Sequence, residues 1–210
     1  MFVRRLFTAA VLVTAFAFLP STAAAQQIGV KAGLNFANIS DVTEDFPEST
    51  QRIGLVGGLF VKVPVTERFS FQVEGLYSEK GLHIEDSDEG IDFEGDLRLR
   101  YLEVPVLGRA DFGTPGSTAN FYVVAGAAPA FKLDGRVRIE ALGEEETDDI
   151  SDDLEAFDLG LVGGLGLEVG NAVVEGRYTH GLRSIGKDAD DDDDGGRNRV
   201  FSVTVGYRFR

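Results

Sequence analysis

The segment Phe201–Arg210 reads F-S-V-T-V-G-Y-R-F-R, with a large apolar or aromatic residue at every second position. Ser, Thr, Gly and Arg occupy the positions between them. Successive side chains of a β-strand point in opposite directions, so this period of two is typical of a strand with one apolar and one polar face. The segment therefore predicts a strand that lies between two different environments.

Seven further segments share this period or come close to it. In Gln27–Asn38 the even positions are apolar and the odd ones polar or small, and glycine at this density disfavours a helix. Phe121–Leu133 is apolar on both faces, which leaves its register open by one residue. Pro105 and Pro129 would each remove one hydrogen bond of the sheet. The eight expected strands are Gln27–Asn38, Ile53–Val63, Arg68–Lys80, Leu97–Phe112, Phe121–Leu133, Phe157–Val169, Ala172–Leu182 and Phe201–Arg210.

Short and long connections alternate along these strands. The short ones are residues 64–67, 113–120 and 170–171, and the four long ones are acidic. Transmembrane β-barrels have short turns on the periplasmic side and long loops outside, and their strands must close on themselves because lipid offers no hydrogen bonds. The sequence predicts an all-β, eight-stranded antiparallel up-and-down transmembrane β-barrel with short periplasmic turns and long acidic extracellular loops.

Composition excludes several other classes of protein. The 210 residues contain 20 Lys and Arg against 35 Asp and Glu, for a net charge of −15, and no Cys. The missing Cys excludes a disulfide scaffold and a thiolate metal site. The negative charge argues against nucleic acid as a partner, because phosphate binding needs clustered Lys and Arg. A hydrophobic content of 43% is too high for a disordered acidic chain.

The negative charge is concentrated in four segments, which hold 26 of the 35 acidic residues and no Lys or Arg. Such runs bury little apolar area and are expected to be solvated loops. On the predicted barrel they face the exterior, where partners would meet them. The four segments are Asp41–Glu48, Glu85–Asp96, Glu140–Glu155 and Asp188–Asp194.

The first 25 residues have the three regions of a secretory signal peptide. Arg4 and Arg5 precede an apolar run at Leu6–Leu19, and small residues follow up to Ala25. The run is too short to span a bilayer. We expect cleavage after Ala25, so that residues 1–25 are the signal peptide and 26–210 the barrel domain. Export then leads to the outer membrane of a Gram-negative bacterium.

The polar faces of the strands are expected to fill the barrel interior. Eight strands enclose a space just wide enough for side chains, so a wide pore is not expected. Glu103 is expected to pair with Lys31, Arg177 or Arg208 rather than to act as an acid catalyst. The candidates for an internal ion-pair network are Lys31, Lys62, Arg68, Glu74, Glu103, Glu168, Glu175, Arg177 and Arg208.

One acidic run resembles part of a calcium-binding loop. Asp190, Asp192 and Asp194, followed by Gly195, match its D-x-D-x-D-G start. The bidentate Glu that completes such a loop is missing, because position 201 is Phe. The three aspartates would therefore form at most a weak site for Ca²⁺ or another divalent cation, or a bridge to lipopolysaccharide, and the alternative is a solvated loop.

No catalytic or cofactor-binding residue is predicted. His180 and Ser184 lie four residues apart on one strand face, about 13 Å, which is too far for a base to reach a nucleophile. His180 is expected to be a polar residue at the membrane interface. His83 begins a predicted loop.

Three stretches resemble a known family. Ile28–Ser40 (IGVKAGLNFANIS), Tyr101–Arg109 (YLEVPVLGR) and Phe201–Phe209 (FSVTVGYRF) are similar to the PorT-like outer-membrane β-barrel family of Gram-negative bacteria. The resemblance spans Gln26 to Arg210. It implies an eight-stranded barrel without known catalytic residues, and some members of the wider group serve type IX secretion or gliding. Such chains usually end on the aromatic residue, whereas Arg210 follows Phe209 here.

The leading hypothesis is a non-enzymatic outer-membrane barrel that acts as a structural, adhesion or secretion-assembly partner through its acidic loops. Its expected partners are outer-membrane lipid or lipopolysaccharide, the barrel-assembly machinery through the C-terminal strand, and other envelope proteins. One alternative is a lipid-modifying enzyme on the same fold. Another is a soluble periplasmic, lipocalin-like barrel, which would need its apolar faces turned inward.

Overall fold

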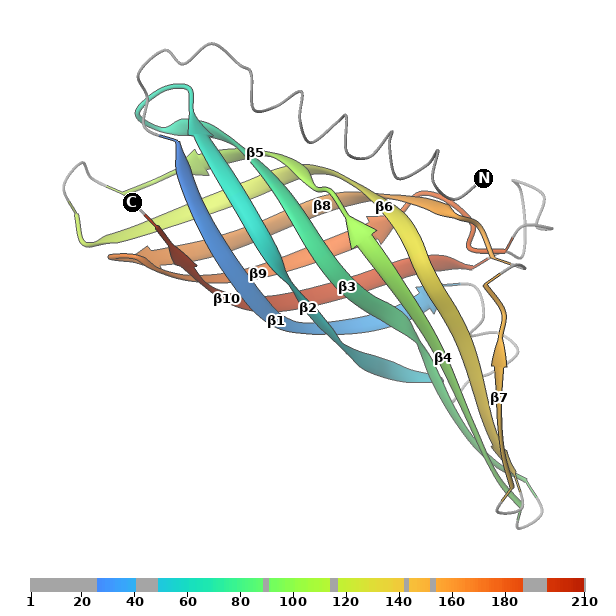
Figure 1. The fold of residues 1–210 in the computed structure, drawn as a ribbon. Helices are drawn as coiled ribbons and strands as arrows, with labels where there is room; N and C mark the ends of the chain where they lie inside the picture. Colours follow the sequence, from blue (N-terminus) through green and yellow to red (C-terminus); the bar gives the residue numbers. More distant parts are fainter. Residues whose placement is uncertain are drawn as a thin grey trace.

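The computed structural model describes residues 26–40, 49–88, 91–113, 117–141, 144–151, 154–186 and 196–209. Within these ranges the chain forms ten β-strands (Figure 1). No helix in them is long and apolar enough to cross a membrane. The strands are β1 (Gln27–Ser40), β2 (Ser49–Pro64), β3 (Phe69–Asp88), β4 (Ile91–Glu103), β5 (Val106–Asp111), β6 (Ala119–Ala141), β7 (Glu144–Asp149), β8 (Phe157–Val169), β9 (Ala172–Gly181) and β10 (Arg197–Arg208).

All the strand pairings are antiparallel, and they run in a ring through eight strands. From β1 the ring passes to β2, β3, β4, β6, β8, β9 and β10, and β10 pairs back with β1. Strand β5 continues β4 along the same two neighbours, β3 and β6. Strand β7 pairs with the outer part of β6. Figure 1 shows the strands tilted around a common axis.

The count of ten strands differs from the predicted eight at two places. The predicted strand Leu97–Phe112 is divided into β4 and β5 at Val104-Pro105, because proline has no N–H to donate. Backbone hydrogen bonds nevertheless continue across the division, from Val104 N to Pro129 O (2.8 Å) and from Glu74 N to Pro105 O (3.0 Å). The second addition is β7, which lies in a segment predicted to be a loop.

Two of the four acidic segments are largely strand rather than loop, so the prediction of four solvated loops was wrong there. Residues 85–88 form the end of β3, residues 91–96 the start of β4, and residues 144–149 form β7. Opposite charges favour the pairing nearest the ring, where Asp96 lies opposite Arg138 and Arg136 opposite Asp149. Farther out, Glu94 lies opposite both Glu85 and Glu140, so charge does not explain the pairing there. Figure 1 shows β3, β4, β6 and β7 extending well beyond the other strands. The other two segments, 41–48 and 188–194, lie outside the described residues, as does the predicted signal peptide.

The two faces of the ring have opposite chemistry. Along β10, Phe201, Val203, Val205 and Tyr207 point outward and are exposed, as their period of two predicts. The inward face is buried and carries polar and charged side chains together with small apolar clusters. The sequence left open which face of β6 points inward, and the structure determines it. The inward residues are Tyr122, Val124, Ala128 and Ala130, which are buried. The outward residues include Phe121, Val123 and Phe131, which are exposed.

Tyr122 occupies the interior because the residue directly opposite it on β8 is Gly166. A Cβ atom on Gly166 would lie 2.2 Å from the Tyr122 ring. The aromatic ring therefore lies over the glycine, as it often does in curved sheets.

Replacing Gly166 with Leu should displace Tyr122 and lower the free energy of unfolding by about 1–3 kcal/mol, because overpacking strains a filled interior. Equilibrium urea unfolding in detergent micelles, followed by tyrosine fluorescence, measures the change. Gly163→Leu on the same strand is the matched control, since a Cβ there meets nothing within 4 Å. Equal losses in the two variants would contradict the inward placement of Tyr122.

Candidate functional site

The centre of the interior is a buried carboxylate, Glu74 on β3. Arg177 on β9 donates to it twice, from Nη1 to Oε2 (2.7 Å) and from Nη2 to Oε1 (2.6 Å). Lys31 on β1 donates to Oε1 from its Nζ (2.8 Å). All three side chains are almost fully buried. The arrangement joins three strands across the lumen.

A second carboxylate, Glu175, completes this central layer. It accepts hydrogen bonds from Lys31 Nζ (3.0 Å) and from the Tyr122 hydroxyl (2.9 Å). Its Oε1 also lies 2.6 Å from Arg177 Nε. Acidic and basic groups thus alternate, which offsets the cost of burying each charge.

Two further layers of ion pairs lie on either side of the central one. Toward the short turns, Arg109 contacts Asp111 (2.6 Å) and Glu168 (2.8 Å), and its guanidinium stacks 3.5 Å from the centre of the Tyr122 ring. Toward the opposite end, Lys80 pairs with Glu103 (2.5 Å). Asp158 there accepts a hydrogen bond from Asn198 (2.9 Å).

The charges of this network are balanced, and little space is left between them. Among the described residues one interior cavity, beside Lys31, Glu103 and Arg177, has a volume of about 20 Å³, which is room for about one water molecule. The six basic members are Lys31, Lys62, Lys80, Arg109, Arg177 and Arg208, and the six acidic members are Glu74, Glu103, Asp111, Asp158, Glu168 and Glu175.

Eight of the nine predicted network residues are confirmed, and Arg68 is the exception. Arg68 is exposed in the turn between β2 and β3, because β3 begins only at Phe69. Glu103 pairs with Lys80 rather than with the predicted Lys31, Arg177 or Arg208. Four members of the network were not predicted. They lie on the same strand faces as predicted members, so the period of two could have identified them: Lys80, Arg109, Asp111 and Asp158.

The other sequence candidates form no catalytic or metal site in the described part of the chain. Ser184 Oγ is buried without a hydrogen-bond partner, so it makes no bond to His180. No group of three or more His, Cys, Asp or Glu that could hold a metal ion occurs among the described residues. Asp190, Asp192 and Asp194 lie outside them, and the weak Ca²⁺ site stays a prediction.

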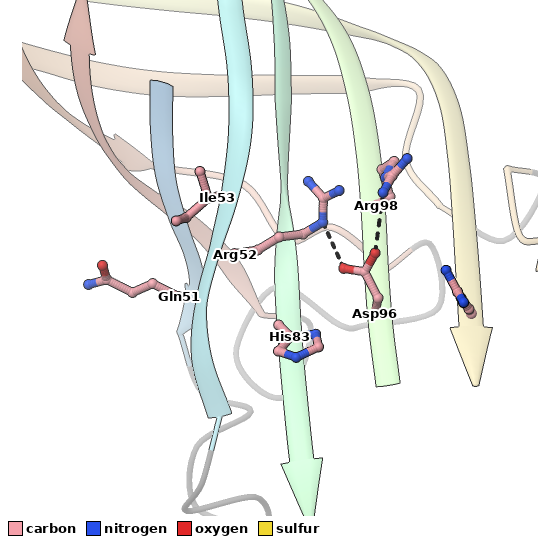
Figure 2. Close-up of a pocket in the computed structure, with 7 residues that line it drawn as sticks. Gln51, Arg52, Ile53, His83, Asp96 and Arg98 are labelled. Atoms are coloured by element: carbon pink, nitrogen blue, oxygen red, sulfur yellow. Dashed lines mark hydrogen bonds and ion pairs between the residues drawn. The ribbon is translucent and has the colours of Figure 1, made fainter. Parts of the chain in front are cut away.

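A cavity of about 380 Å³ lies on the outer surface of the wall, near the end with the long strands. Figure 2 shows Asp96 between two arginines, with Arg52 Nε 2.7 Å and Arg98 Nη2 3.6 Å from its carboxylate oxygens. The residues that line the cavity include Arg52, Ile53, His83, Asp96, Arg98 and Arg138.

Arg52 reaches this cavity from β2 by crossing β3 at Gly81. The β2–β3 register shifts between Gln51 and Val56, which opens the space beside Arg52. Gly81 has a φ of +143°, and a Cβ there would lie 1.8 Å from the carbonyl oxygen of Leu97 and 3.0 Å from Arg52 Cδ. Only glycine leaves room for this crossing.

Comparisons with known proteins point to one family. A family profile described as "outer membrane protein beta-barrel domain" matches residues 23–186. No curated protein matches the chain in sequence.

Solved structures of small outer-membrane proteins are similar at low identity. Ail, the attachment invasion locus protein of Yersinia pestis, is 13% identical over 88% of this chain and 97% of Ail, with a TM-score of 0.43. Neisserial surface protein A is 16% identical over 88% and 97%, with a TM-score of 0.42. The outer membrane enzyme PagL is 12% identical over 85% and 98%, with a TM-score of 0.38. With TM-scores below 0.5, these similarities support no functional inference.

Replacing Arg177 with Met should lower the free energy of unfolding by about 3–5 kcal/mol, because Glu74 and Glu175 would then share the single cation Lys31. Urea unfolding in micelles measures the loss. The control is Arg136→Gln, which removes an exposed pair with Asp134 and should cost about 1 kcal/mol or less. Similar losses in both variants would contradict a buried, stability-determining network.

Proposed function

The chain belongs to the outer membrane protein β-barrel domain family, and from this premise we propose that it is a closed, eight-stranded, non-enzymatic barrel of the Gram-negative outer membrane. Its lumen is filled by side chains, and its acidic segments serve as a structural, adhesion or secretion-assembly surface. Within the wider family, the PorT-like group is the proposed placement, on the three sequence stretches that resemble it.

The observation that carries this proposal is the opposite chemistry of the two faces. Large apolar side chains such as Ile53, Phe69 and Val205, each about 60% exposed, cover the outside, and twelve charged residues pair inside. Water would penalise such an exterior, whereas hydrocarbon accepts it. The ring of pairings that joins β1 to β10 and β2 to β3 supports the proposed closure, which would leave no strand edge open to lipid.

The filled lumen favours a role that does not depend on transport. The central layer of Lys31, Glu74 and Arg177 crosses the interior, and the cavity beside it has room for about one water molecule. The exposed surfaces that remain for function are the two ends and the wall. In strand β10 the outward aromatic residues Phe201 and Tyr207 support the proposed recognition by the barrel-assembly machinery.

The two alternatives receive less support. A lipid-modifying enzyme needs a base within reach of a nucleophile, and Ser184 Oγ makes no hydrogen bond to His180. A soluble lipocalin-like barrel needs its apolar faces inside, and here they lie outside. The non-enzymatic barrel is therefore the function we propose.

The full chain, expressed in a Gram-negative host, should be recovered in the outer-membrane fraction and should migrate differently on a detergent gel when boiled and unboiled. A closed barrel resists detergent at room temperature because its backbone hydrogen bonds are all internal. Recovery in the soluble periplasmic extract without a mobility shift would overturn the proposal.

Replacing the acidic residues of 41–48 and 188–194 with Asn and Gln should leave the mobility shift intact and reduce adhesion of the expressing cells at least fivefold, because charged rim groups guide encounters with partners. Variants with one segment neutralised at a time serve as controls and locate the effect. Unchanged adhesion, together with unchanged cross-linking to envelope proteins, would mean that these segments only solvate the barrel.

A further inference from the structure

On the outer wall, the side chains change from apolar to charged between one outward-facing position of a strand and the next. On β3 and β4 the outward pair Tyr77–Leu102 is apolar and exposed, and the next outward pair toward the long-strand end is Glu79–Arg100. The same change occurs on β6, where Phe131 lies opposite Leu102 and Asp134 opposite Arg100. If the wall spans a membrane as proposed, this step marks the boundary between acyl chains and headgroups.

The cavity at Arg52 lies on the charged side of this boundary and touches the apolar side. Ile53, which is 61% exposed, lines the cavity, and Leu55 continues the apolar surface from it along β2. Arg98 and Asp96 line the cavity from β4, one and two outward positions beyond Arg100. A molecule seated here would place a polar group in the cavity and apolar chains along the wall.

The cavity has an excess of positive charge in a strongly acidic protein. Three arginines, Arg52, Arg98 and Arg138, line it together with one carboxylate, Asp96, and a second carboxylate, Glu79, lies close enough to interact with Arg52 and Arg98. Arg52 is only 7% exposed, and its Nη1 has no hydrogen-bond partner; the Nε of Arg98 is buried and likewise unpaired. Buried guanidinium donors without partners are costly. Both guanidinium groups line the cavity, where a phosphate would bind them through their remaining donors.

We propose that this cavity binds the phosphate of a lipid headgroup in the outer leaflet of the membrane, an inference that rests on the proposed membrane-spanning barrel. The arginines contact the phosphate, and the acyl chains of the lipid lie along Ile53 and Leu55. A net charge of −15 repels free anions that approach through solution. A lipid anion instead arrives through the membrane, beside the apolar wall.

The test is native mass spectrometry of the full chain in detergent, titrated with diphosphorylated lipid A, with the same lipid after removal of its phosphates, and with inorganic phosphate. Binding of the phosphorylated lipid should be at least tenfold tighter than that of the phosphate-free lipid. The variant Arg98→Gln/Arg138→Gln should lose this preference. Both side chains lie on the outer surface, so the barrel should still fold, and the boiled-against-unboiled gel shift checks this.

The matched control is Arg68→Gln, which removes an exposed arginine in the turn at the opposite end of β2 and β3 and should change lipid binding less than twofold. If the Gln variant fails to fold, Arg98→Lys/Arg138→Lys replaces it and should weaken binding because Lys lacks the bidentate guanidinium. Equal losses in variant and control, no phosphate preference, or equally tight binding of inorganic phosphate would overturn the inference. Absence of the gel shift in the unmodified protein would instead overturn the proposed function.

Discussion

No water reaches the hydrocarbon of a membrane, so every backbone N–H and C=O group there must find its partner within the protein. The ring of antiparallel pairings meets this constraint, because β10 returns to β1 and β2 continues to β3. The alternation of apolar and polar residues follows from the place of each strand in the ring, because one face of the strand contacts the hydrocarbon and the other faces the interior. Even the proline break at Val104-Pro105 is bridged by backbone bonds to Glu74 and Pro129.

Charged residues of different sign occupy different parts of the protein. Inside, six acidic and six basic groups neutralise one another. On the outer wall beyond the apolar surface, arginines such as Arg52, Arg98 and Arg138 gather around one aspartate. Most of the carboxylates lie in four segments of the sequence without any Lys or Arg. One chain with a large negative charge can therefore have a neutral interior and a cationic site on its wall.

The sequence alone predicted the strands well where alternation is strict, and poorly where charge replaces it. The bounds of Phe157–Val169 match β8, and the outward face of Phe201, Val203 and Val205 is as expected. The strand ends in the acidic segments were missed because their pairing depends on distant residues, such as Asp96 opposite Arg138. The sequence predicted which charged residues point into the interior. It could not predict which of them pair, because pairing depends on the register between strands and on the position of each residue along the barrel axis. The pair of Lys80 and Glu103 is an example. The cavity at Arg52 was not predicted, because it needs the register shift and the crossing at Gly81.

The central layer also has a consequence for the order in which the barrel forms. Glu74 and Arg177 are 103 residues apart in the chain, and Lys31 and Glu175 are 144 apart. Arg177 and Glu175 can pair within β9, but Glu74 and Lys31 meet their partners only when β1, β3 and β9 have come together. An incompletely assembled barrel would therefore place unpaired charges in the hydrocarbon. Folding must then be cooperative and slow, with its barrier dominated by long-range closure. A protein built in this way benefits from a catalyst that holds the strands until the last one joins the first.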